Sequence, residues 1–221
     1  MSLTKFLSKR KRREGKISAG IIPDFKVVTL GESGCGKTSL VQWFLRQRPL
    51  MNKELGATVA ASFSRHTFEE SPGEGGPMMG LWDTAGSERY CALAKLYYRD
   101  AFGAILCYDV SDYHSWDRLR YWINELNENK PGCRLYIVGC KADLPREICP
   151  ERVTELVEKH KAIFFETSSK TGFQINEVFR IIYDDYREQR RIQEKLASDE
   201  DAMSGSIHLG EETRSKPCFL C

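Results

Sequence analysis

The stretch GESGCGKT, residues 31–38, decides how this chain folds. It matches the pattern G-x-x-x-x-G-K-[ST], follows the apolar run FKVVTL at 25–30, and precedes residues with apolar side chains at helical spacing. Glycines let the backbone turn so that successive N–H groups point at an anion, and the start of a helix adds partial positive charge. The sequence therefore predicts a strand, a phosphate-binding loop and a helix. In this loop we expect Lys37 to contact the β- and γ-phosphates of a nucleotide, and the Thr38 hydroxyl to bind Mg²⁺.

Strand-like apolar runs alternate with helix-period segments along the rest of the chain, which favours an α/β fold with helices on both faces of a mostly parallel sheet. The turn-rich SPGEGGP at 71–77 predicts an antiparallel hairpin at one edge of that sheet. We expect a flexible basic extension over 1–22, one folded domain over 23–196, and a flexible C-terminal tail over 197–221. The six expected strands are 25–30, 59–68, 78–82, 101–110, 134–140 and 163–166.

The composition is typical of a soluble globular protein, with 41% hydrophobic and 29% charged residues. The net charge of +2 gives no argument for binding to nucleic acid. Most cysteines are scattered singly, several within apolar runs, as in reduced intracellular proteins. No apolar run is long enough to span a membrane as a helix. We expect the chain to be a monomer located in the cytoplasm.

A second segment, WDTAG at 82–86, follows the third expected strand. An aspartate that ends a buried strand beside the phosphate loop is the second metal anchor that this chemistry needs. We therefore expect Asp83 to hold Mg²⁺ through water and the Gly86 N–H to meet the γ-phosphate.

A third pair of segments, CKAD at 140–143 and ETSSK at 166–170, indicates which base is bound. The Asp143 carboxylate can accept two hydrogen bonds from guanine, N1–H and the exocyclic amine, and adenine offers no such pair. The stem of Lys141 would pack along the base, and a backbone N–H near Ser169 would reach the guanine O6. A P-loop kinase of small molecules receives no support, because nothing resembles a lid or an acceptor site.

In this order the motifs, together with a lone Thr58, resemble a small GTPase of the Ras superfamily over about residues 24–190. Within the superfamily the chain is similar to the Rab branch, and WDTAGSERY combined with ETSSKTG is especially similar to the atypical Rab subgroup linked to autophagy. The resemblance implies the small GTPase form of the P-loop NTPase fold. The Rab-like marks are Trp82, SERY at 87–90, YYR at 97–99, CYDV at 107–110 and VAASF at 59–63.

The resemblance implies a GTP hydrolase that binds GTP or GDP with Mg²⁺, with Thr58 as the threonine that senses both the metal and the γ-phosphate. The expected catalytic residues are Lys37, Thr58, Gly86 and Ser87. The expected Mg²⁺ ligands are Thr38, Thr58 and Asp83. The expected nucleotide-binding residues are Gly31, Glu32, Ser33, Gly34, Cys35, Gly36, Lys37, Thr38, Ser39, Thr58, Asp83, Gly86, Cys140, Lys141, Asp143, Ser168, Ser169 and Lys170.

The resemblance also implies partners: effectors, an exchange factor, a GTPase-activating protein and the prenylation machinery, at the cytoplasmic face of endomembranes. Effectors are expected to bind residues 55–68 and 84–99, which overlap the two segments, 46–63 and 84–98, whose order depends on the nucleotide. Phe63, Tyr97 and Tyr98 are either partner-facing or core aromatics, because aromatic side chains are common in both settings.

Three positions depart from the family pattern. Ser87 replaces the glutamine that orients the attacking water, so intrinsic hydrolysis should be slow unless a partner supplies the missing group. Cys140 replaces an asparagine, and a thiol is a poor hydrogen-bonding substitute. No aromatic residue stands at 49–51 to cover the base, which favours faster nucleotide exchange. Two functions stay open: a slowly cycling trafficking switch, and a non-hydrolysing scaffold that recruits partners by nucleotide occupancy.

The two ends of the chain carry further signals. The C-terminal CFLC fits C-a-a-X, and Cys218 with Cys221 also fits double geranylgeranylation; the alternative is two unmodified thiols. The basic run KRKRR at 9–13 is a solvated tail, a localisation signal, or a segment that binds acidic lipids.

Overall fold

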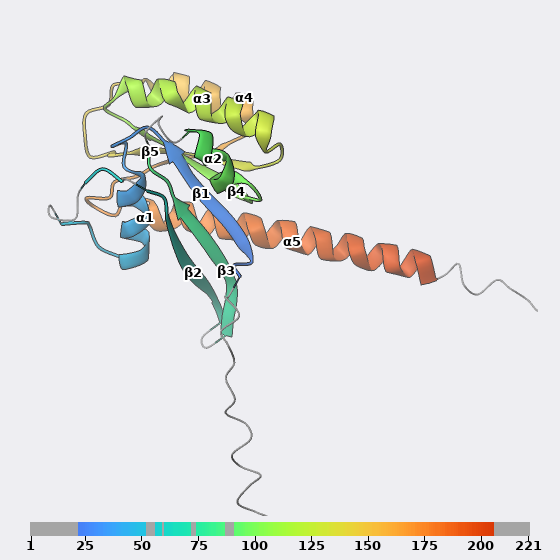
Figure 1. Ribbon diagram of the computed structural model, residues 1–221. Coiled ribbons are helices and arrows are strands. Elements are labelled where there is room, and N and C mark those ends of the chain that lie inside the picture. Colours follow the sequence, from blue (N-terminus) through green and yellow to red (C-terminus); the bar gives the residue numbers. More distant parts are fainter. Residues whose placement is uncertain (1–21, 52–55, 59, 72–73, 87–90, 206–221) are drawn as a thin grey trace, which may run out of the picture.

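The computed structural model describes residues 22–51, 56–58, 60–71, 74–86 and 91–205 (Figure 1). Six strands form one sheet in the order β2-β3-β1-β4-β5-β6. The strands are β1 (Phe25–Gly31), β2 (Ser62–Ser71), β3 (Glu74–Asp83), β4 (Gly103–Asp109), β5 (Arg134–Cys140) and β6 (Ile163–Glu166). The helices within the described residues are α1 (Lys37–Arg46), α2 (Cys91–Tyr98), α3 (Tyr113–Asn129), α4 (Pro150–His160) and α5 (Ile175–Gly205).

The strand directions confirm the predicted fold class. β1 pairs in parallel with β3 and β4, β5 pairs in parallel with β4, and β6 with β5. β2 pairs antiparallel with β3, which makes the predicted hairpin at one edge of the sheet. β1 and β4 are buried along almost their whole length, as expected of parallel strands covered on both faces, and this is why they read as continuous apolar runs.

Two hydrophobic cores lie on opposite faces of the sheet. One joins α1 and α5 to the sheet, with the rings of Phe44 and Phe179 stacked at 3.8 Å. The other places α3, Tyr98 of α2 and Val153 of α4 against the opposite face. Figure 1 shows α3 and α4 on one side of the strands and α1 with α5 on the other. This packing fixes the carboxyl ends of the strands, where the loops with functional motifs begin.

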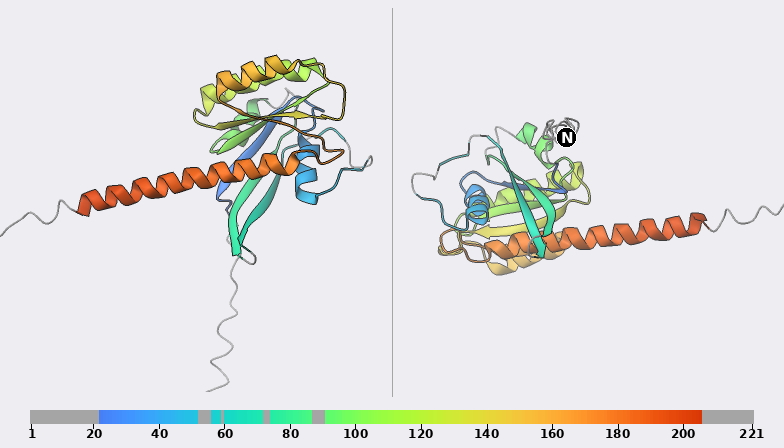
Figure 2. Two further views of the ribbon diagram at one scale, coloured as in Figure 1. Left: turned by 180° about the vertical axis from the view of Figure 1, so that it is seen from behind. Right: turned by 90° about the horizontal axis from the view of Figure 1, so that it is seen from below.

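The sequence predicts a C-terminal tail from residue 197, and in the structure α5 continues to Gly205. Figure 2 shows this helix projecting beyond the body of the domain. The polar composition after Lys195 favours a tail, but residues 196–204 contain neither glycine nor proline and therefore also suit a solvent-exposed helix. The Arg190–Glu194 pair, at 2.8 Å and i,i+4 spacing, is of the kind that supports such a helix.

Several predictions concern residues outside the described ranges: the basic extension, Ser87, Cys218 and Cys221. Among the described residues, no helix combines the length and the apolar character needed to cross a membrane.

Candidate functional site

The sequence motifs meet at one edge of the sheet. Each motif begins at the end of a strand: the phosphate loop (residues 31–38) at the end of β1, WDTAG at the end of β3, CKAD at the end of β5 and ETSSK at the end of β6. Because β1, β3, β5 and β6 are parallel, these four loops gather at the carboxyl ends of the strands, where open α/β sheets bind ligands.

Two adjoining cavities lie among these loops. The phosphate cavity, about 410 Å³, is lined by Ser33, Gly34, Gly36, Lys37, Thr38, Ser39, Gly56, Ala57, Thr58, Gly86 and Lys141. The base cavity, about 390 Å³, is lined by Gly36, Ser39, Pro49, Leu50, Cys140, Lys141, Asp143, Leu144, Ser169 and Lys170. They share Gly36, Ser39 and Lys141, so one elongated ligand can occupy both.

The phosphate loop presents a buried cation and an uncapped helix start. Lys37 is 5% exposed, and its Nζ donates to the carbonyl oxygens of Gly31 at 3.0 Å and Glu32 at 2.8 Å. Gly36 precedes α1 with φ 117° and offers no side-chain cap, which leaves the first helical N–H groups for an anion. The lysine, the N–H groups and the helix start together fit a polyphosphate.

Asp83 and two threonines fit a magnesium ion. Asp83 is 1% exposed, and its Oδ1 accepts a hydrogen bond from the Thr29 hydroxyl at 3.2 Å. Its Oδ2 is buried and has no hydrogen-bond partner among the described residues, which a cation would satisfy. Burial raises the pKa of Asp83, although Thr38, Thr29 and Lys37 act in the opposite direction. The hydroxyls of Thr38 and Thr58 approach each other to 2.6 Å, so oxygen donors from distant parts of the chain meet beside the phosphate loop.

Gly86 packs directly against the phosphate loop. A Cβ at this position would collide with the Lys37 Nζ and with the Ser33 nitrogen, so only glycine allows the approach. The segment after β3 therefore brings its backbone to the phosphate cavity.

In the base cavity, neighbouring side chains orient the Asp143 carboxylate, which the sequence predicts to accept hydrogen bonds from guanine. Asp143 Oδ1 accepts from the Ser168 hydroxyl at 2.5 Å, and Lys170 Nζ lies 3.8 Å from Oδ2. Lys141 Nζ lies 2.6 Å from Asp109 Oδ2, an ion pair that the sequence motifs do not predict. Burial alone would raise the pKa of Asp109, but hydrogen bonds from Lys141 and Ser111 hold it below its ordinary value.

Three buried cysteines that are far apart in sequence belong to one core cluster: Cys35 of the phosphate loop, Cys107 of β4 and Cys140 of β5. The Cys35 thiol donates to the Cys107 carbonyl oxygen at 3.4 Å. A Cβ at Gly36 would lie 3.3 Å from the Cys140 sulfur, so that sulfur supports the loop from below. Cys140 is therefore in contact with the phosphate loop. Pro49 and Leu50 line the base cavity, at the position where the family often has an aromatic residue.

The structure separates the aromatic residues whose setting the sequence left open. Tyr98 is 2% exposed and its hydroxyl donates to Glu125 at 2.7 Å, so it is a core residue. Phe63 is 44% exposed and its ring lies 5.1 Å from Trp82, which lies 5.7 Å from Tyr97. The aromatic patch (Phe63, Trp82, Tyr97) thus joins the two segments expected to contact effectors.

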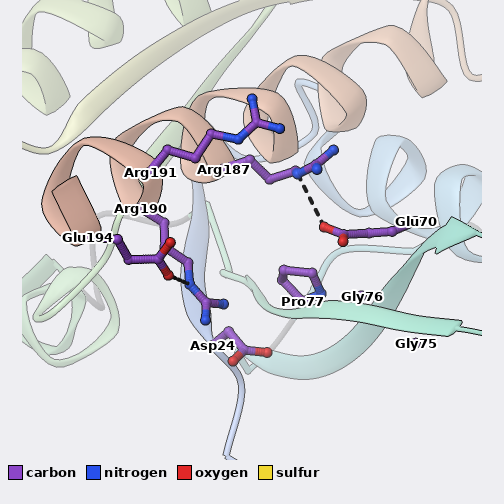
Figure 3. Close-up of a pocket in the computed structure, with 9 residues that line it drawn as sticks. All are labelled: Asp24, Glu70, Gly75, Gly76, Pro77, Arg187, Arg190, Arg191 and Glu194. Carbon is purple, nitrogen blue, oxygen red and sulfur yellow. Dashed lines mark hydrogen bonds and ion pairs between the residues drawn. The ribbon is translucent and has the colours of Figure 1, made fainter. Parts of the chain in front are cut away.

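A further cavity of about 460 Å³ lies between the β2–β3 hairpin and α5 (Figure 3). Arg187 pairs there with Glu70 at 3.1 Å, and Arg190 with Glu194 at 2.8 Å. The two ion pairs compensate the charges of Arg187 and Arg190, and the cavity lies away from the carboxyl ends of the parallel strands. It is therefore not part of the candidate site.

The fold and the two cavities define a nucleotide-binding protein of the phosphate-loop class. A model of the Ras family matches residues 26–188. The chain is 39% identical to the Ras-related protein Rab-5B of Plasmodium falciparum over 70% of its length and 73% of that protein. It is 38% identical to Rab-24 of Dictyostelium discoideum (74% and 81%) and 31% identical to Rab-13 of Canis lupus familiaris (88% and 91%). The chain therefore belongs to the Ras family of small GTPases, and its relatives are Rab proteins.

Proposed function

We propose that this chain is a Rab-like switch of membrane trafficking that binds Mg²⁺ with GTP or GDP and hydrolyses GTP slowly. The observation that carries the proposal is the meeting of Lys37, Thr38 and Thr58 at one cavity, next to a second cavity that contains Asp143. The buried Asp83 carboxylate does not line the first cavity but interacts with its residues Thr38 and Lys37. Family members bind guanine nucleotides with Mg²⁺, and the donors gathered here suit each part of that ligand.

Each residue has a role that follows from its position. Lys37 would exchange two carbonyl acceptors for phosphate oxygens and would neutralise their charge. Thr38, Thr58 and Asp83 would hold Mg²⁺, which supplies charge stabilisation for the phosphates when bound. Asp143, oriented by Ser168, would accept the two N–H groups of guanine.

Slow hydrolysis rests on Ser87, whose hydroxyl is too short to orient water where most family members have glutamine. The test is single-turnover hydrolysis by the purified protein, beside a Ser87→Gln variant. We expect the variant to be much faster, and equal rates would show that residue 87 does not limit the chemistry.

A second function is a scaffold that signals by nucleotide occupancy without useful hydrolysis, and both Ser87 and Cys140 favour it. The nucleotide bound to freshly purified protein separates the two functions. Mostly GTP, with no turnover even beside candidate activating proteins, would establish the scaffold. Mostly GDP, or measurable turnover, would establish the switch.

The aromatic patch supports effector binding through residues 55–68 and 84–99, because Phe63 is exposed beside the half-buried Trp82 and Tyr97, and aromatic side chains are enriched at interfaces. We also propose lipidation at Cys218 and Cys221, which would attach the protein to endomembranes, and a role in the autophagy-linked subgroup that WDTAGSERY and ETSSKTG resemble. An exchange factor and an activating protein would complete the cycle. Replacing both cysteines by serine should move the protein from the membrane fraction to the soluble one; unchanged partition would argue against lipid attachment.

A further inference from the structure

The phosphate loop carries a carboxylate directly beside a residue that lines the phosphate cavity. Glu32 is the second residue of the loop, and its side chain is only 13% exposed. Its Oε1 accepts a hydrogen bond from the N–H of Ser33 at 2.9 Å. A negative charge this close to the phosphate cavity opposes the binding of a polyphosphate unless another group compensates it.

Arg118 of α3 is the compensating group. Its Nε lies 3.4 Å from Glu32 Oε2, and its guanidinium lies 4.6 Å from the centre of the Tyr121 ring. The Nε atom is itself buried and makes no hydrogen bond within the described part of the chain, so its contact with Glu32 is electrostatic. The neighbouring Trp116 and Leu119 are buried in the core, which fixes the helix that carries the arginine.

The position of Lys37 indicates which contact the Arg118–Glu32 pair prevents, namely one between the Glu32 carboxylate and the Lys37 ammonium group. Lys37 Nζ already donates to the Glu32 carbonyl oxygen at 2.8 Å, so the ammonium group lies beside the backbone of Glu32. Gly86 packs against the same place, because a Cβ there would collide with both Lys37 Nζ and the Ser33 nitrogen. A Glu32 carboxylate released from Arg118 would be a competing partner for the lysine that the phosphates need.

We infer that Arg118 is a positioning residue for nucleotide binding: it holds the Glu32 carboxylate away from Lys37 and cancels its charge. The inference rests on the proposed function, because it concerns the same phosphate cavity. It assigns to α3 a direct influence on the phosphate loop. The influence is larger for GTP than for GDP, because GTP adds negative charge at the Ser33–Gly86 end of the cavity.

The experiment compares the affinities of fluorescent GDP and a non-hydrolysable fluorescent GTP analogue for the full chain with Mg²⁺ at low ionic strength. In Arg118→Ala we expect the GTP analogue to bind on the order of tenfold more weakly, and GDP to be affected less. Adding Glu32→Ala to this variant should restore binding to within about twofold of the wild type, because the carboxylate is then gone while the backbone N–H of residue 32, the part of it expected to contact phosphate, is kept. Arg120→Ala, on the same helix but in a cavity between α3 and α4, is the matched control and should bind normally.

The rescue distinguishes charge compensation from simple structural damage, which a second substitution would not repair. Wild-type affinity in Arg118→Ala, or an equal loss in the single and double variants, would overturn the inference and leave the proposed function intact. If the wild type itself binds no guanine nucleotide, the proposed function fails instead. Should Arg118→Ala not fold, as judged by circular dichroism, Arg118→Gln keeps the first three carbons of the side chain, removes the charge, and is tested with and without Glu32→Gln.

Discussion

Replacing Asp143 by asparagine tests the guanine site most directly. The Asp143 carboxylate receives one hydrogen bond from Ser168 at 2.5 Å and retains acceptor sites toward the base cavity. Guanine would add two hydrogen bonds to this charged group, each contributing about 1.5–3 kcal/mol. Losing both corresponds to about 3–6 kcal/mol, or roughly a hundredfold to ten-thousandfold in affinity. The amide of asparagine can still accept from Ser168, so the free energy of unfolding should change by less than about 1 kcal/mol.

The assay is displacement of fluorescent GDP by unlabelled GDP, inosine diphosphate and xanthosine diphosphate. In the wild type, inosine diphosphate should bind about tenfold to a hundredfold more weakly than GDP, because it lacks the exocyclic amine and therefore one hydrogen bond. In Asp143→Asn, xanthosine diphosphate should bind better than GDP, because its C2 carbonyl can accept from the new amide. If the variant binds GDP as the wild type does, or if the order of the three nucleotides is unchanged, Asp143 does not read the base.

Three further predictions follow from the same contacts. Cys140→Asn should slow the release of fluorescent GDP, because an amide can connect the base to the phosphate loop as a thiol cannot; an unchanged or faster release rate would contradict this. Asp83→Asn should raise the free energy of unfolding of the metal-free protein by about 1–2 kcal/mol in urea, because the unpartnered buried oxygen loses its charge. The same substitution should remove the effect of Mg²⁺ on nucleotide release. A lower free energy of unfolding would argue against an unsatisfied carboxylate. The lowered pKa of Asp109 predicts stability that is present above the ordinary aspartate pKa and is lost as the pH falls through the folded value. Lys141→Met should reduce that loss in acid-unfolding curves, and identical curves would exclude the Lys141–Asp109 pair as its source.

The loops of the site could be predicted because each carries its own chemistry in consecutive residues. GESGCGKT, WDTAG and CKAD each follow an apolar run, and parallel strands bring such loops to one edge. The hairpin was visible for the same reason, since its turn residues stand between two strand-like runs. Local pattern thus determined both the fold class and the principal candidate residues.

The supporting residues could not be predicted, because their roles depend on the register between strands. Thr29 stands opposite Asp83 in the β1–β3 pair, which is why its hydroxyl reaches that carboxylate. Asp109 stands opposite Cys140 in the β4–β5 pair, and the next residue, Lys141, forms the ion pair with Asp109. Arg118 reaches Glu32 only after α3 has packed on the sheet. Thr29 and Arg118 lie outside the motifs, and Asp109 lies in CYDV, a Rab-like mark that does not indicate a contact with Lys141.

The contact between Cys140 and Gly36 links the two halves of the nucleotide site. Gly36 lines both cavities, and the sulfur of Cys140 lies beneath it, so a change at the base side reaches the phosphate side through a single packed contact. The family's asparagine would make this link through hydrogen bonds, which have a preferred direction, whereas a thiol makes it mainly through van der Waals packing. Under the proposed function, such a site would keep its specificity for guanine through Asp143 and would still hold the base less firmly. Specificity and residence time would then be set by different residues, Asp143 and Cys140.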